Sequence, residues 1–523
     1  MRSFSKMLTS IIAASAAVGL SVAVPAHADT PVITWENCPK SAVRPGLSCG
    51  RIDVPRDYSN PHGEKISIGF VQHTATKTAK DVVFVNPGGP GSDVYDFLGD
   101  TEVMEFPEEF LQNFTIIGVQ PRGMHGSTPL TCTDDQKADV LQTITNSGGQ
   151  LRAACERTNP GYFPHITTEN TARDWEEVRK ALKKDTISIY GVSYGTLLGS
   201  TYATLFPERT NKVLLDSGLD HTKKWTDSSK QQETGFIRVL HDFFEWAAAH
   251  DDTFHLGATP YAVYTTWAET IQRQSGVWPS VMPPRATEAD LPPHLKGLGQ
   301  PAVDAMNNTA RAQAESKSVG TAAAAGGSSQ KLSSVLVMTH LSLQIPKYWK
   351  NIIGYIQSPE LADQDLGKRK AQLTDESEKD AIAAASVVNR TIMCNEAVQP
   401  WDRNLALRAV WANWILQDQF SGAPVASAWG YTCNGAPPIT HGVPLDGSKL
   451  KTRPLQIQGT SDPRTALENS QELRSSMNAH LITVHGPGHG HFGAGNKQVD
   501  RVALDYLYTG NVTVTDVPGY FQQ

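Results

Sequence analysis

The chain has 523 residues, of which 19% are charged and 39% hydrophobic, and its formal net charge is −7 at pH 7. This acidic balance argues against nucleic acid and anionic membrane surfaces as partners, because both attract a basic protein surface. A chain of this length can bury a large core without the help of disulfides.

The first 28 residues have the pattern of a secretory signal peptide. Arg2 and Lys6 precede an apolar stretch from about residue 7 to residue 24, which ends in an Ala-x-Ala cleavage sequence at Ala28. We therefore expect export, cleavage after Ala28, and a secreted protein with no membrane association once the signal is removed. An uncleaved membrane anchor is the alternative, although the apolar stretch is short for a spanning helix.

Six cysteines are expected to form disulfides in an exported chain. None are spaced as CxxC, so neither a zinc knuckle nor a thioredoxin-type redox site is predicted. Six cysteines allow fifteen pairings, and their grouping along the chain favours pairing between neighbours. The expected disulfides are Cys38–Cys49, Cys132–Cys155 and Cys394–Cys433.

Between residues 82 and 218, short apolar runs alternate with turns and helix-like segments. Four such runs are each followed by a turn containing Gly or Pro, and they begin at Val82, Thr115, Ile187 and Val213. This order predicts an α/β fold with a mainly parallel sheet that is covered on both faces.

From about residue 220 the strand pattern stops and helical periodicity takes over. Helices are predicted within 236–249, 261–274 and 376–388, and a flexible stretch is predicted at 320–329, where Gly and Ser flank four alanines.

The strand pattern resumes near the C-terminus, at Leu455 and again at Leu481. We therefore predict one sheet domain, built from residues 29–219 and 446–523, with a helical cap inserted at 220–445, rather than two domains in series.

The segment Gly191-Val-Ser-Tyr-Gly195 matches the pattern GxSxG. The bare pattern is weak evidence, but here it lies directly between an apolar strand and a helix-like segment that begins at Thr196. In a nucleophile elbow, a strained turn in this setting lifts the serine above the sheet, and the glycines allow close packing. Ser193 is the predicted nucleophile, and a plain Gly-rich turn with an inert serine is the alternative.

An acyl-transfer serine needs backbone N–H groups directed at the developing oxyanion. One is expected from Tyr194, and the other from Gly89 or Gly88 in the Asn-Pro-Gly-Gly-Pro-Gly loop at 86–91. A phosphate-binding loop is the alternative, but no Gly-Lys-Ser/Thr follows and the GxGxxG spacing is absent.

Several motifs together resemble those of the secreted tripeptidyl aminopeptidases of actinobacteria, in the prolyl aminopeptidase-like branch of the α/β-hydrolases. The motifs are Asn86-Pro-Gly-Gly-Pro-Gly, Pro121-Arg-Gly, Asn170-Thr-Ala-Arg-Asp174, Tyr190-Gly-Val-Ser-Tyr-Gly-Thr196 and Leu205-Phe-Pro-Glu208. The resemblance implies an α/β-hydrolase fold with a helical cap, and it supports the cysteine pairing given above. Two departures are Gln120, where the family usually has Asp, and the absence of the family's C-terminal cysteine pair.

The acid and the base of an α/β-hydrolase follow the nucleophile in that order along the chain. Asp462 lies in the turn after the predicted strand at Leu455, at an edge where catalytic groups gather, and it is the predicted acid. A helix N-cap is its alternative role. Asp216, after an earlier strand, is the second candidate for the acid.

Three histidines, His485, His489 and His491, lie close together after the last predicted strand. The spacing H-x3-H would suit a metal on a helix, but the intervening Gly and Pro residues exclude a helix, so no metal site is predicted. His489 follows the turn and precedes Gly, as the catalytic histidine of the family does. It is the predicted base, and His491 is the second candidate.

The predicted function is that of a serine exopeptidase without a cofactor, acting as a monomer through an acyl-enzyme. The resemblance implies release of tripeptides from free N-termini of peptides or proteins. The ammonium group would then need a carboxylate, and Glu233 and Glu396 are the candidates. The alternatives are a carboxylesterase or lipase with the same triad, a prolyl aminopeptidase that releases one residue, and a non-catalytic binding module.

Overall fold

The computed structural model describes residues 31–101, 104–132, 145–223, 225–326, 332–372, 376–397, 402–415 and 419–522. The predicted signal peptide lies outside these ranges. Residues 31–523 form one compact unit, and the predicted domain boundaries at 220 and 445 stay predictions. Among the described residues, none of the helices combines the length and apolar character that a bilayer crossing requires.

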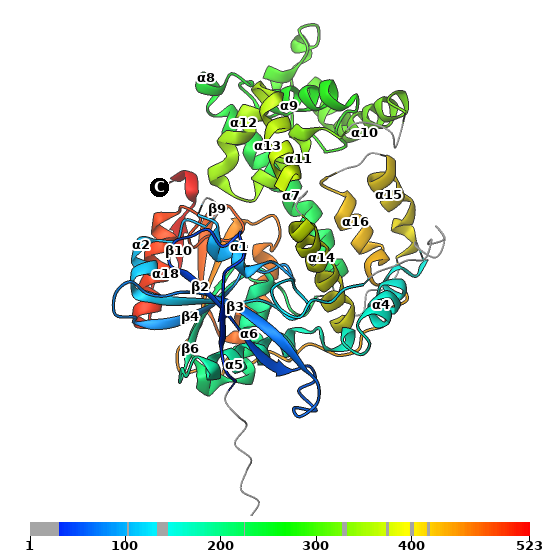
Figure 1. Cartoon of the computed structure of the whole chain (residues 1–523). Helices are drawn as coiled ribbons and strands as arrows, with labels where there is room; N and C mark the ends of the chain where they lie inside the picture. Colours follow the sequence, from blue (N-terminus) through cyan, green and yellow to red (C-terminus); the bar gives the residue numbers. More distant parts are fainter. Residues whose placement is uncertain are drawn as a thin grey trace, which may run out of the picture. The chain divides into compact units, whose positions relative to one another are not determined.

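Ten strands of the described chain form a single sheet (Figure 1). Their order is β1-β2-β3-β5-β4-β6-β7-β8-β9-β10; β1, β2, β3 and β5 pair antiparallel, and the strands from β5 to β10 pair parallel. The predicted mainly parallel sheet is confirmed. The bounds are β1 Thr34–Glu36, β2 Leu47–Pro55, β3 Lys65–His73, β4 Asp81–Asn86, β5 Phe114–Val119, β6 Ile187–Val192, β7 Thr210–Asp216, β8 Leu455–Ser461, β9 His480–Pro487 and β10 Asp516–Pro518.

Helices cover both faces of the sheet because its central strands are apolar on both sides. In β4, Phe84 belongs to the apolar core on one face, and its neighbours Val83 and Val85 belong to the core on the other. The first core includes side chains of α5 (Thr168–Ala181), α6 (Tyr194–Leu205) and α17 (Gln471–Met477). The second includes side chains of α1 (Val94–Gly99), α2 (Glu108–Asn113) and α18 (Lys497–Thr509).

The described residues between β7 and β8, which we call the helical segment, contain helices and no strand. Its α-helices are α7 Trp225–Ala248, α8 Asp251–Phe254, α9 Pro260–Ser275, α10 Gln300–Ala324, α11 Ser334–Leu343, α12 Trp349–Gln357, α13 Pro359–Gln372, α14 Glu376–Glu396, α15 Ala406–Val410 and α16 Gly422–Ala428. The helices predicted at 236–249, 261–274 and 376–388 coincide with α7, α9 and α14.

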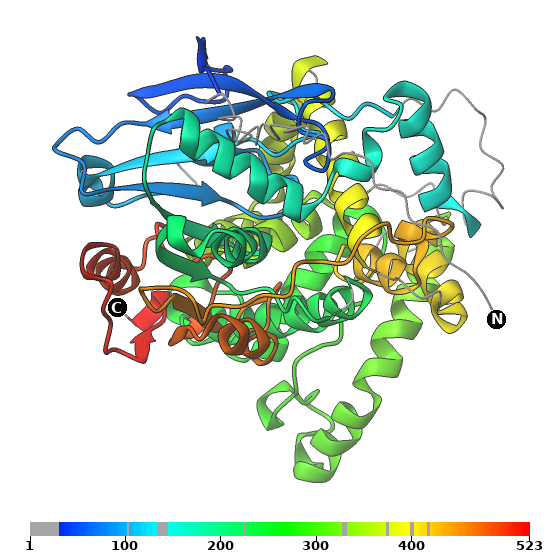
Figure 2. The same ribbon diagram turned by 90° about the horizontal axis from the view of Figure 1, so that it is seen from below.

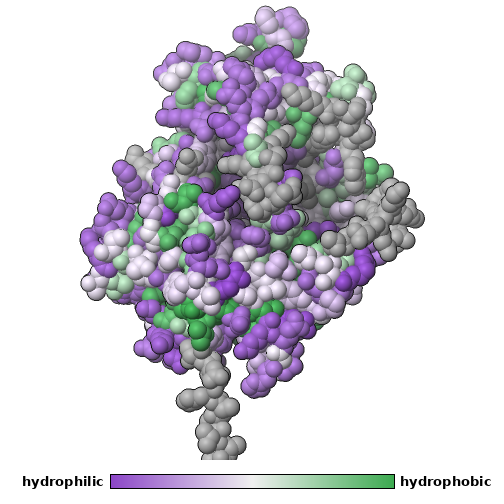
Figure 3. All heavy atoms as spheres, in the orientation of Figure 1, coloured by the Kyte–Doolittle hydropathy of each residue, from purple (hydrophilic) through white to green (hydrophobic). Residues whose placement is uncertain are grey.

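The helical segment has an apolar core of its own, which includes Phe243, Trp267 and Trp349. Its helices extend beyond the sheet in both ribbon views (Figures 1 and 2). The face shown in Figure 3 is hollowed between the group of helices from α9 to α13 and the part of the molecule that contains the sheet.

One prediction in the helical segment was wrong in part. The stretch 320–329 was expected to be flexible, but α10 continues to Ala324. Four consecutive alanines explain the difference, because Ala has the highest intrinsic helix propensity and outweighs Thr321 and Gly320 at the start of the run. Residues 327–329 lie outside the described ranges.

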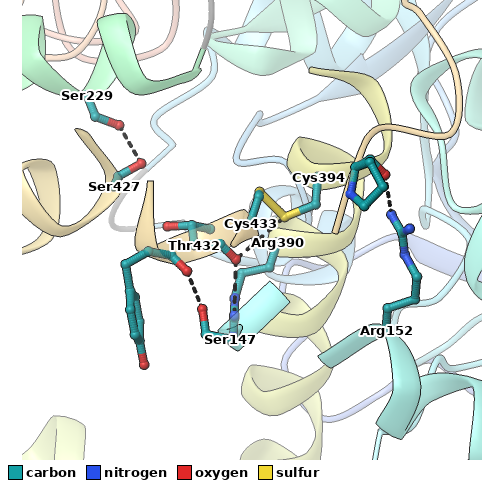
Figure 4. Close-up of a disulfide and its surroundings, with 10 residues drawn as sticks. Ser147, Arg152, Ser229, Arg390, Cys394, Ser427, Thr432 and Cys433 are labelled. Carbon is teal, nitrogen blue, oxygen red and sulfur yellow. Dashed lines mark hydrogen bonds between the residues drawn. A yellow bond between two sulfur atoms is a disulfide. The ribbon is translucent and has the colours of Figure 1, made fainter. Parts of the chain in front are cut away.

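The structure contains three disulfides, between the same cysteines that neighbour pairing predicts: Cys38–Cys49, Cys132–Cys155 and Cys394–Cys433. The third joins the C-terminal part of α14 to the short helix Tyr431–Cys433 (Figure 4). Around it, Arg390 donates to the backbone oxygen of Thr432 at 3.1 Å, and Ser147 of α4 (Ser147–Thr158) donates to that of Tyr431. The disulfide thus joins two parts of the helical segment, and the hydrogen bond from Ser147 links this segment to α4, which precedes β6.

Candidate active site

The elbow after β6 places Ser193 at the N-terminus of α6, in a backbone conformation that L-residues rarely adopt. Its φ is 57° and its ψ is −124°. A Cβ at Gly191 would lie 2.2 Å from the backbone oxygen of Gly195, and one at Gly195 would lie 2.3 Å from that of Asn86. Both positions of the GxSxG pattern therefore require glycine, and the bend they permit turns Ser193 out of the strand.

The loop after β4 lies against this elbow. A Cβ added to Gly88 would lie 2.9 Å from Cβ of Ser193 and 3.2 Å from the backbone nitrogen of Tyr194. Gly88 and Gly89 both have φ of 105°, and the side chain of Asn86 accepts a hydrogen bond from the Gly88 N–H at 2.9 Å. The loop predicted to supply an oxyanion donor is thus adjacent to the nitrogen of Tyr194, the other predicted donor.

Asp462 and His489 meet beyond the ends of β8 and β9. Nδ1 of His489 lies 3.0 Å from each carboxylate oxygen of Asp462. Both side chains are shielded, with 9% of His489 and 0% of Asp462 exposed to solvent. The contact fixes the ring of His489 by its Nδ1 and leaves its Nε2 for another partner.

The acid is stabilised in its ionised form. Asp462 accepts hydrogen bonds from the backbone N–H groups of Arg464 and Thr465, at 2.8 and 2.9 Å, and from Oγ1 of Thr465 at 2.9 Å. Burial opposes ionisation, but His489 and these donors outweigh it and lower the pKa of Asp462. Asp462 thus caps a turn and binds His489, but it is not a helix N-cap, because the next helices begin only at Leu467 and Gln471.

The loop after β9 is held by its backbone N–H groups. The N–H of Gly490 donates to Oγ of Ser217 at 2.8 Å, and those of His491 and Phe492 donate to one carboxylate oxygen of Asp216 at 2.8 and 2.9 Å. Asp216, the second candidate for the acid, therefore anchors the histidine loop from the end of β7 instead of contacting Nδ1 of His489.

Two carboxylates that accept backbone N–H groups of the histidine loop, Asp216 and Asp500, have raised pKa values. Burial raises the pKa of Asp216, although His491 and the backbone donors act in the opposite direction. Burial also raises the pKa of Asp500 in α18, to about 7, and its carboxylate accepts the N–H of Gly493 at 2.8 Å. Neither Ser217 nor Asp500 was predicted, because no local sequence motif marks them.

The three clustered histidines have three different environments. His485 is exposed at the end of β9, and its Nε2 lies 2.9 Å from Asp516. His489 contacts Asp462. His491 is buried with burial lowering its pKa, and its Nε2 has no hydrogen-bond partner within the described structure. The imidazoles therefore do not converge on a common point.

The two carboxylates predicted to bind an ammonium group differ in their partners. Glu233 in α7 forms an ion pair with Arg408. Glu396, at the end of α14, is half-buried and accepts hydrogen bonds from the backbone N–H of Thr168 and from its Oγ1, the latter at 2.9 Å. Burial raises the pKa of Glu396 to about 7. Oγ1 of Thr168 also lies 2.7 Å from the hydroxyl of Tyr194, which links Glu396 to the elbow.

Gln120, the residue that departs from the family pattern, has a structural role. Its Nε2 donates to the carboxylate of Asp93 and to the backbone oxygen of His125, both at 2.6 Å, and its Oε1 accepts the N–H of Val94 at 3.1 Å. An amide is suited to this position because it donates and accepts at once. None of these partners is Ser193, Asp462 or His489.

Family models agree with this fold. Residues 81–294 match the model described as alpha/beta hydrolase fold, and residues 420–518 match the model described as TAP-like protein. The described chain therefore has an α/β-hydrolase fold, and the predicted fold is confirmed.

Its relatives include peptidases. Tripeptidyl aminopeptidase from Streptomyces lividans is 32% identical over 45% of this chain and 48% of its own length, so the chain spans about half the length of that relative. Serine protease Hip1 from Mycobacterium tuberculosis is 29% identical over 40% of this chain and 44% of its own. Carboxylesterase B from the same species is 24% identical over 93% of this chain and 90% of its own. The predicted resemblance to tripeptidyl aminopeptidases is confirmed.

Proposed function

We propose that the protein is a serine peptidase that works through an acyl-enzyme, with Ser193 as nucleophile, His489 as general base and Asp462 as the acid that orients it. The observation that carries this proposal is the buried contact between Nδ1 of His489 and Asp462, at the same sheet edge as the strained elbow of Ser193. An imidazole held at Nδ1 by a carboxylate presents Nε2 to a nucleophile.

The reaction begins when Nε2 of His489 takes the proton of Ser193, whose oxygen attacks the scissile carbonyl. The N–H groups of Tyr194 and Gly89 stabilise the oxyanion, because the N–H of Gly88, the other candidate, already donates to the side chain of Asn86. His489 then gives its proton to the leaving amine. In the second half of the reaction, His489 takes a proton from water, which attacks the acyl-enzyme and releases Ser193. Asp462 stays ionised and stabilises the imidazolium, which its lowered pKa favours.

Exopeptidase specificity would follow from recognition of a free N-terminus. Glu396 is suited to this task because, among the described residues, no basic side chain pairs with it, whereas Glu233 already binds Arg408. A half-buried carboxylate gains stabilisation from an ammonium group through charge-assisted hydrogen bonds. Together with the Streptomyces relative named for tripeptidyl aminopeptidase activity, this supports release of tripeptides from free N-termini.

A substrate comparison tests this function. The purified protein would be assayed on a tripeptidyl anilide with a free N-terminus, on the N-acetylated anilide and on a short-chain ester. Cleavage of the free anilide alone is expected, and equal rates on the acetylated anilide would refute the exopeptidase. Ser193→Ala should abolish labelling by a fluorophosphonate without loss of folding.

A carboxylesterase is the second candidate, because a relative that matches 93% of the chain carries that name. Turnover of the ester with no cleavage of either anilide would favour it. Release of a single N-terminal residue would instead favour a prolyl aminopeptidase.

We also propose that the protein is secreted. Three disulfides support an oxidising compartment. N-terminal sequencing of the exported protein would test the predicted cleavage after Ala28.

A further inference from the structure

Gln344, directly after α11 in the helical segment, contacts both loops that carry the acid and the base. Its backbone oxygen accepts the N–H of His489 at 2.9 Å. Its side-chain Oε1 accepts a hydrogen bond from Nε of Arg464 at 2.6 Å, and Arg464 is two residues beyond Asp462. A single residue therefore joins the two loops at the point where they meet.

A second element of the helical segment, α7, holds the acid loop from another side. Nη2 of Arg238 donates to the backbone oxygen of Asp462 at 3.3 Å. A Cβ added to Gly235 would lie 2.4 Å from the backbone oxygen of Pro463, so the helix backbone lies directly against the loop. The acid loop is thus enclosed by residues more than a hundred positions earlier in the chain.

We propose that Gln344 is a positioning residue for the acyl-transfer site, so that the helical segment completes this site as well as covering it. The proposal rests on the roles proposed for Ser193, Asp462 and His489. Gln344 acts through its two hydrogen bonds: one fixes where the loop of His489 begins, and the other fixes Arg464 and hence the turn of Asp462.

The side-chain bond has the geometry that this role needs. The Arg464 guanidinium is half-buried and lies 5.3 Å from the ring centre of Phe236, so its direction is restricted. A hydrogen bond to a charged donor in such surroundings is stronger than one between neutral groups. Without Oε1 of Gln344, Arg464 would lose this acceptor and the turn that it shares with Asp462 would be free to shift.

The proposal can be tested with a small fluorophosphonate, which reacts with the nucleophile and does not depend on peptide binding by the helical segment. The rate at which a small fluorophosphonate inactivates the protein would be measured for the wild type, Gln344→Ala, Gln344→Glu and Gln357→Ala, beside kcat and KM on the free tripeptidyl anilide. Gln357 is the matched control, because it ends α12 and donates to the backbone oxygen of Phe254 at the exposed surface.

Gln344→Ala is expected to slow inactivation and to lower kcat by a similar factor, roughly tenfold, with KM little changed, since one hydrogen bond to a charged group is lost. Gln344→Glu keeps an acceptor for Arg464 and should rescue both rates, and Gln357→Ala should match the wild type. Inactivation of Gln344→Ala at the wild-type rate would overturn the proposal, whether or not KM rises.

Two further results distinguish a failure of the proposed role of Gln344 from a failure of folding and from a failure of the proposed function. If Gln344→Ala does not fold, Arg464→Met removes the donor of the same bond from the other side, and it must show the same loss for the proposal to stand. If the wild type itself is not labelled at Ser193, the proposed function has failed rather than the role of Gln344.

Discussion

The elbow that carries Ser193 and the loop that carries His489 are held in place by different means. The elbow depends on glycines within four residues of one another and on close approach of backbone to backbone. The histidine loop depends on side chains that lie far away in sequence: Asp216 is 275 residues from His491. The comparison shows that the elbow is specified largely by one short motif, although Gly195 also lies against Asn86 of β4, whereas the histidine loop depends on the assembled fold.

The substitution expected to disturb the elbow of Ser193 most is Gly191→Ala. The new Cβ would lie 2.2 Å from the backbone oxygen of Gly195, which cannot move without distorting the elbow. We expect destabilisation of about 3 kcal/mol or more and loss of fluorophosphonate labelling, measured by thermal unfolding and by labelling of the folded fraction.

Gly320→Ala is the control for that substitution. Gly320 lies in α10 with no atom near its would-be Cβ, so Ala should keep labelling intact and stabilise the protein by about 0.5–1 kcal/mol. Equal behaviour of the two variants would show that the elbow does not require glycine.

Asp216→Ala is expected to disturb the loop that carries His489. This change leaves the buried N–H groups of His491 and Phe492 without an acceptor, at a cost of about 3 kcal/mol. We expect kcat to fall by about a hundredfold as His489 loses its position. Asp216→Asn keeps an oxygen that can accept both N–H groups, so its kcat should stay close to that of the wild type; equal losses in both variants would indicate that the charge matters more than the anchor.

Glu396, which links the elbow to the helical segment through Thr168, gives a pH-dependent test. Its pKa is about 7 in the folded protein and near 4.5 when unfolded, so the folded state binds the proton more tightly. Its contribution to stability is fully present below pH 4.5 and is lost as the pH rises through 7.

Relative to Glu396→Gln, the wild type should therefore lose up to about 3 kcal/mol of unfolding free energy between pH 4.5 and 8. Urea titrations at several pH values measure the difference. A constant difference across this range would contradict the raised pKa, and an unchanged KM for the free anilide in Glu396→Gln would contradict its proposed contact with substrate.

The mildest test concerns Thr465, whose Oγ1 donates to Asp462 and lies 3.5 Å from Nδ1 of His489. Thr465→Val keeps the shape but removes the donor, and we expect kcat to fall by roughly tenfold or less, about 1 kcal/mol. Thr465→Ser should retain most of the activity. If Val and Ser variants behave alike, the hydroxyl does not contribute.

The same contrast explains what the sequence could predict. Ser193, Tyr194 and the glycine loop at 86–91 follow from local motifs, and Asp462 and His489 were proposed from chain order after a strand. The anchors Ser217, Asp500 and Gln344 could not be found in this way, because each acts only once β7, α18 or α11 has packed beside the histidine loop. The sequence also did not indicate that Glu396 binds Thr168 whereas Glu233 pairs with Arg408.

The disulfide between Cys394 and Cys433 has a consequence for how the protein is prepared. It closes a span of 39 residues that starts two residues before Glu396 and includes α16, which packs on α7. Material made in a reducing cytosol would lack this crosslink as well as the other two. Such a preparation could still react with a fluorophosphonate and yet process peptides poorly, so the oxidation state of each batch should be checked by mass spectrometry before its activity is interpreted.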